Sequence, residues 1–147
     1  MGNQQTGIEI DAKQFPAQRE FALPAVPDSI SDVVDDIMAF IAESASGTGK
    51  EPEISLAVQE ALANAVIHGA GSDASKMVYC TVGCSPTEGV VIVVRDPGPG
   101  FDPGEVRNPL SPVGLTAEHG RGVHLIRELM DDVTFERNGA QIRMRKK

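Results

Sequence analysis

The chain has 147 residues, of which 41% are hydrophobic and 23% are charged, and its formal net charge is −8. This length and balance favour one globular domain and exclude a disordered or fibrous chain. Basic residues are scattered apart from a short tail at 143–147, which argues against direct binding to nucleic acid. No apolar run approaches the roughly 20 residues that span a bilayer, and residues 1–14 show no signal-peptide pattern, so we expect a cytoplasmic protein without membrane contact.

The chain begins with a segment over residues 1–18 that we expect to be flexible, before a single domain over residues 19–147. Residues 19–23 predict a short strand, and Asp28 and Ser29 then offer caps to a helix. The apolar residues of this helix recur at the i, i+3, i+4, i+7 spacing of an amphipathic helix: Ile30, Val33, Val34, Ile37, Met38 and Ile41. The Gly-rich linker at 44–50 lacks the spacing of a phosphate-binding P-loop, so we interpret it as a connection between helices.

A second helix is predicted over residues 52–68, with Gly69 as its C-terminal stop. At about 100° per residue, Glu60, Asn64 and His68 fall on one polar stripe. Apolar residues flank the stripe on both sides, with Ile54, Val58, Ala61, Leu62 and Ala65 on one and Leu56, Ala63, Val66 and Ile67 on the other. Buried polar groups need partners, which here are either other core side chains or a ligand with its metal. For His68, a capping or core role and a ligand role both stay open.

Two β-branched runs, at 76–83 and 89–95, predict an antiparallel pair of strands. Cys80 and Cys84 lie on one face of the first strand, too far apart to form a disulfide, and this spacing favours buried thiols over a zinc site. The second run leads directly into the turn Asp96-Pro-Gly-Pro-Gly100.

The remaining chain predicts a loop, a helix and a hairpin. Residues 103–119 lack periodicity, which is typical of a functional loop, and we expect a mobile lid there. A helix is expected to start at Gly120. Strands at 133–137 and 141–145 flank Asn138-Gly139, which predicts a two-residue hairpin turn.

Two of these features can bind the phosphates and the metal of a nucleotide. Asn64 offers an amide oxygen to Mg²⁺, a hard cation that takes few protein ligands. Gly120 and Gly122 would expose unpaired N–H groups at the start of a helix, where phosphates bind favourably.

A third feature can bind the base. Asp96, at the end of a central strand, can accept a hydrogen bond from an exocyclic amine such as that of adenine. Gly98 and Gly100 let the backbone pass close to a flat ring.

Three segments carry a resemblance to a known superfamily: Glu60-x-x-x-Asn64-Ala-x-x-His68-Gly, Asp96-x-Gly-x-Gly-Phe-Asp102 and His119-Gly-Arg-Gly-Val-His-Leu-Ile-Arg-Glu-Leu-Met-Asp131. In order and spacing they resemble the N box and the two Gly-rich boxes of the GHKL superfamily, which includes gyrase, histidine kinases and MutL. More narrowly, the chain resembles from about residue 19 to residue 145 the stand-alone anti-sigma factor serine-protein kinases of bacterial partner-switching systems. The resemblance implies an α/β protein of the α+β two-layer type. This is the Bergerat ATP-binding fold, with a mixed, mostly antiparallel sheet and helices on one face.

The resemblance also implies how ATP or ADP would be bound. Asn64 would bind Mg²⁺ and Asp96 would bind adenine, with Gly98 and Gly100 beside the base. The phosphates would lie near Gly120, Arg121 and Gly122. Glu60 becomes the general base that takes the proton of a substrate serine hydroxyl.

The function implied is an ATP-dependent serine/threonine-protein kinase that also binds a sigma factor and phosphorylates an anti-sigma-factor antagonist, thereby regulating transcription. His124 and a lid whose only basic residue is Arg107 depart from the family's pattern. An anti-sigma factor that binds nucleotide without transferring phosphate therefore stays open. A histidine kinase catalytic domain is disfavoured because no dimerisation or phospho-accepting segment precedes residue 19. A homodimer, formed through apolar faces of the first helix and the strands, is a further expectation.

Overall fold

The computed structural model describes residues 7–44, 49–98 and 117–147 of the chain. In these residues, one five-stranded sheet has the order β1-β2-β3-β5-β4. Its strands are β1 (Ala17–Pro24), β2 (Met77–Ser85), β3 (Gly89–Arg95), β4 (Asp132–Glu136) and β5 (Gln141–Lys146). All neighbouring strands in this described sheet are antiparallel, so the sheet is not mixed as the resemblance implied.

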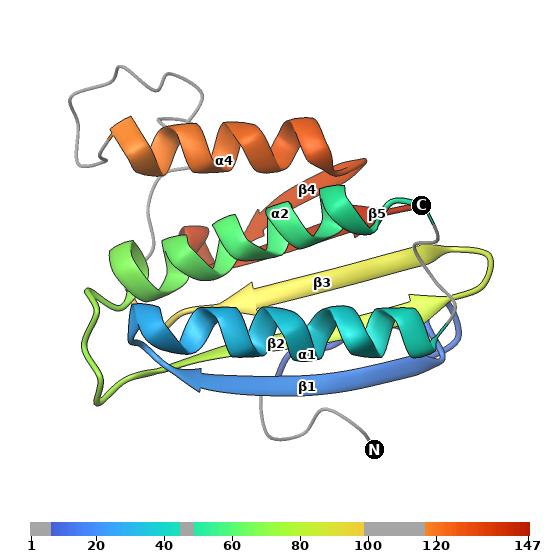
Figure 1. Ribbon diagram of the computed structural model, residues 1–147, viewed down its shortest axis with the longest axis horizontal. Helices are drawn as coiled ribbons and strands as arrows, with labels where there is room; N and C mark the ends of the chain where they lie inside the picture. Colours follow the sequence, from blue (N-terminus) through green and yellow to red (C-terminus); the bar gives the residue numbers. More distant parts are fainter. Residues whose placement is uncertain (1–6, 45–48, 99–116) are drawn as a thin grey trace.

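The helices form a second layer on one face of the sheet, which confirms the α+β two-layer architecture (Figure 1). They are α1 (Ile30–Glu43), α2 (Glu51–Ala63) and α4 (Ala117–Leu129), with α2 packed between the other two. The register places Val82 opposite Ile92 and Val94 opposite Ile142, so alternate residues of neighbouring strands face the helices together. No helix in the described part of the chain is long and apolar enough to cross a membrane.

Helix α1 follows the predicted amphipathic pattern, because Val34, Ile37 and Ile41 are buried in the core. Its apolar face is therefore not available for the homodimer contact that we expected from the sequence. Ser29 does not cap the helix. Its hydroxyl instead donates hydrogen bonds to the carbonyls of Pro24, at 2.9 Å, and Val26, at 2.7 Å.

Helix α2 and the turn after it are exposed along part of the second flank, which corrects the expectation of a buried helix. Ile54, Val58 and Leu62 are fully buried. On the other flank Val66 is fully buried, whereas Leu56 and Ile67 are 39% and 43% exposed. The polar stripe between the flanks therefore lies at the border between core and solvent, where a ligand can reach it.

Residues 7–16 form an N-terminal strap on the sheet face opposite the helices. Ile8, Ile10 and Phe15 are buried there against Val91 and Val93 of β3. The side-chain amide of Gln18 donates to the carbonyls of Ile10, at 2.9 Å, and Phe15, at 3.1 Å. From Ile8 onward the structure thus contradicts the flexible segment predicted over residues 1–18.

The C-terminal hairpin is present, but its turn is longer than predicted. Glu136 pairs with Gln141, so four residues, rather than Asn138 and Gly139 alone, connect the strands. Arg137, Asn138 and Gly139 all have positive φ, at 53°, 59° and 92°. Three successive left-handed residues are rare outside glycine, and only the last of these is a glycine.

Candidate nucleotide-binding site

The last turn of α2 leads into a wider, π-helical turn, Asn64–Gly69, where the sequence predicted a continuous α-helix to His68. The N–H of Ala70 donates to the carbonyl of Ala65, five residues back, at 2.8 Å. Glu60 and Asn64 stay one turn apart and are both half-buried. Single π turns within helices occur frequently at functional sites. His68 is exposed, so it has no core role.

Helix α4 brings Gly122 against this pair of polar residues. A β-carbon at Gly122 would lie 3.0 Å from Oε2 of Glu60 and 3.3 Å from Oδ1 of Asn64. The absence of a side chain at this position therefore leaves the space that the carboxylate and the amide occupy. Glu60 and Asn64 of α2 and Gly122 of α4, which lie far apart in the sequence, thus meet at one place in the fold.

The glycines of α4 do not stand at its first residue. The helix begins at Ala117, three residues before the predicted start, so Gly122 is its sixth residue. Since the unpaired N–H groups of a helix belong to its first turn, the N–H of Gly122 is not among them here. Phosphate contacts of Gly120, Arg121 and Gly122 stay predictions, and the side chains of residues 117–121 lie outside the described part of the chain.

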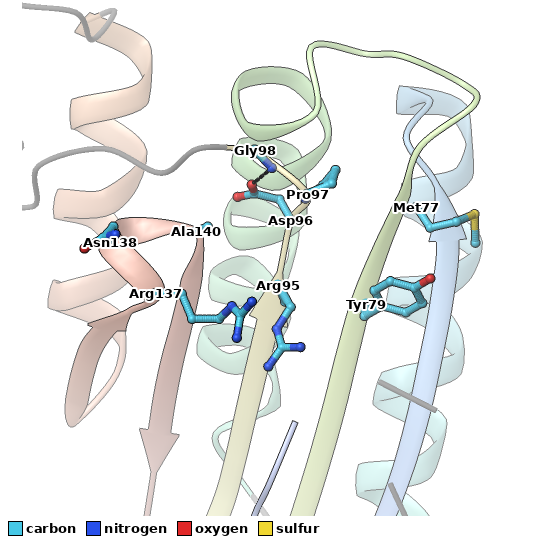
Figure 2. A pocket seen from close by; sticks show the side chains of 9 residues that line it. All are labelled: Met77, Tyr79, Arg95, Asp96, Pro97, Gly98, Arg137, Asn138 and Ala140. Atoms are coloured by element: carbon cyan, nitrogen blue, oxygen red, sulfur yellow. Dashed lines mark hydrogen bonds between the residues drawn. The ribbon is translucent and has the colours of Figure 1, made fainter. Parts of the chain in front are cut away.

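Asp96 follows β3 directly and is held by its neighbours on both sides. Its N–H donates to the carbonyl of Ala140 at 2.9 Å, and its Oδ1 accepts the N–H of Gly98 at 2.7 Å (Figure 2). Burial raises the pKa of the Asp96 carboxyl to about 6, although the hydrogen bond from Gly98 partly opposes this shift. The carboxyl is therefore fixed in direction and ready to accept a hydrogen bond from a ligand.

Gly69 is a site residue that the sequence identified only as a helix stop. A β-carbon at Gly69 would lie within 3.0 Å of the carboxylate of Asp96, and one at Gly98 would lie within 3.0 Å of the Gly69 carbonyl oxygen. Gly69, Asp96 and Gly98 are thus in van der Waals contact, and no larger side chain fits at either glycine. The π turn that Asn64 begins therefore ends against Asp96, which links the two halves of the site.

The residues that meet here suit a hard divalent cation. The carboxylate of Glu60 and the amide oxygen of Asn64 are both oxygen donors, and Mg²⁺ takes one or two such protein ligands beside water and phosphate oxygens. In the described residues no group of three or more histidine, cysteine or acidic side chains could hold a metal by itself. The donor set therefore fits a cation that arrives with a nucleotide better than a permanent structural metal.

Some predicted parts of the site cannot be located. Gly100 and most of the expected lid at 103–119 lie outside the described residues.

Cys80 and Cys84 are buried free thiols in the core, as their spacing predicted.

Comparison with known proteins identifies the family. The histidine kinase-like ATPase domain matches residues 23–146. The anti-sigma F factor of Geobacillus stearothermophilus is 36% identical over 103 residues, which cover 68% of this chain and 69% of that protein. The anti-sigma F factor of Bacillus velezensis is 32% identical over 132 residues, which cover 86% of this chain and 88% of that protein. The chain therefore belongs to the histidine kinase-like ATPase domain family, in the branch that includes the anti-sigma F factors.

Proposed function

We propose that this protein is an ATP-binding anti-sigma factor with serine/threonine-protein kinase activity, which phosphorylates an anti-sigma-factor antagonist in a bacterial partner-switching system. One observation carries the proposal: Glu60, Asn64 and Gly122 meet beside the Asp96 turn, in a chain related to anti-sigma F factors. The names of those relatives support the sigma-factor partner, and the family supports ATP as the ligand.

In this proposal the nucleotide lies between α2 and α4. Asp96 accepts a hydrogen bond from the exocyclic amine of adenine, and Gly98 lets the backbone approach the ring. Asn64 holds Mg²⁺ through its amide oxygen. Gly120, Arg121 and Gly122 line the phosphate end, and Gly100 lies beside the base. Bound Mg²⁺ would supply positive charge, which a protein of net charge −8 needs near a triphosphate.

Glu60 is the general base of the proposed reaction. As the hydroxyl oxygen of the substrate serine attacks the γ-phosphorus, the carboxylate of Glu60 takes the hydroxyl proton, and ADP leaves with the electrons of the broken P–O bond. Its carboxylate is only half-buried and lies beside Asn64, so a serine side chain from solvent can reach it.

The alternative is an anti-sigma factor that binds nucleotide and acts by sequestration only. The departures at His124 and in the lid favour this alternative, because few positive groups would stabilise the transferred phosphoryl group. The two functions share the nucleotide site and differ only in the role of Glu60.

The substitution Glu60→Gln distinguishes the kinase from the anti-sigma factor that only sequesters. The amide keeps the shape of the side chain but cannot take a proton. We expect unchanged affinity for ADP with Mg²⁺ by calorimetry and a loss of about 10²-fold or more in transfer of labelled phosphate from ATP to a candidate antagonist protein. Asn64→Ala should weaken both. Glu53→Gln, the same substitution on the same helix, is the matched control and should change neither.

Each result supports one function. A transfer rate within a few-fold of the wild type in Glu60→Gln would remove the catalytic role and leave the ATP site intact. Wild-type protein that binds ADP but transfers nothing to any candidate would favour sequestration. An absence of heat with millimolar ATP and Mg²⁺ would contradict both.

The proposed partners are a sigma factor, an antagonist protein and a second copy of this chain. The homodimer must use a surface other than the apolar face of α1, because that face lies in the core. Light scattering at high protein concentration, with and without ADP, tests the dimer, and a monomeric mass under both conditions would contradict it.

A further inference from the structure

A pocket of about 480 Å³ lies on the side of the Asp96–Gly98 turn that faces away from the helices (Figure 2). Its walls come from the start of β2, the end of β3 and the turn between β4 and β5, and they include Met77, Tyr79, Arg95, Pro97 and Arg137. This volume is within the range of about 300–1,000 Å³ that is typical of small-molecule sites.

Asp96 and Gly98 also line this pocket, but the carboxylate of Asp96 is engaged on another side. It lies against Gly69, at the end of the π turn, and thus on the side of the helices. Tyr79 and Arg95 are directly opposite each other on β2 and β3 and share the other face of the sheet. The Asp96–Gly98 turn therefore borders both the pocket and the nucleotide site, whereas Tyr79, Arg95 and Arg137 belong to the pocket alone.

Arg95 and Arg137 both line the pocket, and the side chain of Arg137 extends toward that of Arg95 (Figure 2). Nε of Arg95 donates to Oε1 of Gln141 at 2.6 Å, which fixes its direction. Arg137 is exposed and makes no ion pair with any described residue. Burial and the like charge of Arg137 lower the pKa of Arg95, and the charge of Glu136 opposes only part of this shift. An anion between the two groups would remove this repulsion.

The carboxylate of Glu136 acts on Arg95 through its charge, but its hydrogen bonds come from other residues. Glu136 accepts from Nε2 of Gln141 at 2.5 Å and from Nε of Arg143 at 3.1 Å. The turn that carries Arg137 is fixed at a left-handed φ, and its Ala140 carbonyl accepts the N–H of Asp96. In a chain of net charge −8, two arginines thus lie in one pocket, and the charge of Glu136 offsets only part of theirs.

We propose that this pocket binds a small phosphate monoester, with its phosphate between Arg95 and Arg137 and its organic part against Met77, Tyr79 and Pro97. Guanidinium groups bind phosphate through paired N–H···O bonds, and two of them match its charge of about −2. We infer an organic part because the pocket has an apolar wall beside the arginines. Inorganic phosphate alone would leave this wall exposed to water.

Tyr79 is the only tyrosine of the chain, so it reports on the pocket without further modification. Protein labelled with ¹³C-tyrosine should give one set of ring resonances. We expect phenyl phosphate to shift them saturably at pH 7.5, with and without saturating ADP, and to bind more tightly than inorganic phosphate or benzoate. Arg137→Asn keeps a residue that tolerates left-handed φ and should weaken phenyl phosphate about tenfold or more. Arg19→Gln removes an equally exposed positive charge outside the pocket and should change the affinity less than twofold.

Four results would overturn the proposal: no shift of the Tyr79 resonances at tens of millimolar phenyl phosphate, benzoate binding as tightly as phenyl phosphate, equal losses in the two variants, or displacement of phenyl phosphate by ADP. The last would mean that the phosphate occupies the nucleotide site. Unchanged melting temperatures in both variants show that a loss of binding is not a loss of folding.

Discussion

Asp96 combines two requirements that conflict at the level of one side chain. It accepts a hydrogen bond from a ligand amine most strongly when it is ionised, yet burial disfavours the ionised form and raises its pKa to about 6. The hydrogen bond from the Gly98 N–H offsets only part of this cost. The result is a carboxyl group that changes charge close to neutral pH.

Nucleotide affinity should therefore fall in mild acid. A protonated Asp96 loses acceptor capacity toward the adenine amine, and at a pKa of about 6 most of the carboxyl is protonated at pH 5. We expect ADP affinity to decrease by up to about tenfold between pH 7 and pH 5, measured by calorimetry. Phosphates of ADP titrate in the same range, so the quantity to compare is the ratio of wild-type to Asp96→Asn affinity. A ratio that does not change with pH would show that Asp96 does not contact the base.

Asp96 should also make stability depend on pH. Its folded pKa of about 6 lies above the ordinary value of 3.8, so the folded protein binds an extra proton between these pH values. Ionised Asp96 thus lowers the free energy of unfolding above pH 6, and this cost disappears as the pH falls toward 4. Asp96→Asn, which can keep the acceptor for Gly98, should raise the melting temperature at pH 7.5 and raise it by roughly half as much at pH 5.

The control for this measurement is Asp73→Asn. Hydrogen bonds from the hydroxyl and the N–H of Ser75 lower the pKa of Asp73, so its ionised form is favoured in the fold. Its replacement should give no gain in melting temperature at pH 7.5. A gain for Asp96→Asn that is equal at both pH values would indicate a packing effect rather than the removal of a charge.

At the scale of elements, the π turn is what joins the two halves of the nucleotide site. Asn64 opens the turn beside Glu60, and Gly69 closes it against Asp96. An α-helix continued to His68, as the sequence predicted, would follow a different path over these residues. The exposed His68 lies within this turn and not in the core.

The elements that follow from short-range pattern were predictable. The 3.6-residue period of α1 and the β-branched runs of β2 and β3 appear in the structure within one or two residues of their predicted limits. These features depend on residues that are close in sequence, so periodicity and turn chemistry are sufficient.

The features that the sequence did not reveal all depend on tertiary contacts. The contact between Asp96 and Gly69 forms only because the π turn after α2 and the end of β3 meet in the fold. Left-handed Arg137 lies in a turn that is tied to Asp96 through Ala140, and sequence propensity favoured a shorter turn at Asn138 and Gly139. Burial of Ile8 and Phe15 requires the strap to return across β3, which no local pattern indicates.

The contact between α4 and α2 depends on the missing side chain at Gly122. Gly122→Ala should favour the helix by up to about 1 kcal/mol, since alanine is the better helix former. Its β-carbon would nevertheless press on Oε2 of Glu60 at 3.0 Å and on Asn64. We therefore expect the affinity for ADP with Mg²⁺ to fall about tenfold while the melting temperature stays the same or rises.

His124→Ala is the matched control, because His124 is exposed on the same helix. It should leave affinity unchanged. If Gly122→Ala binds ADP as well as the wild type, the close approach of α4 to the Glu60–Asn64 pair has no part in nucleotide binding.

Different parts of the chain cover the two faces of the sheet. Three described helices cover one face, and the strap covers part of the other (Figure 1). The family match begins at residue 23, so the strap lies before the shared domain. It is anchored by polar contacts as well as by its apolar residues, since Arg143 donates to the Glu9 carbonyl at 3.0 Å. Strand faces over Val91 and Val93 are therefore not open to a second copy of the chain while the strap is in place.

The strap should contribute measurably to the stability of the whole domain. Phe15 is 4% exposed, and the guanidinium of Arg145 lies 5.4 Å from its ring centre. Phe15→Ala removes a buried ring and should lower the free energy of unfolding by about 3 kcal/mol, which corresponds to about 10 °C in Tm. It should also shift the ring resonances of Tyr79, which packs against the same cluster. Lys13→Ala, an exposed change in the same strap, should alter neither. If Phe15→Ala and Lys13→Ala have the same Tm, the N-terminal segment does not stabilise the domain. It would then behave as the flexible segment that the sequence alone predicted.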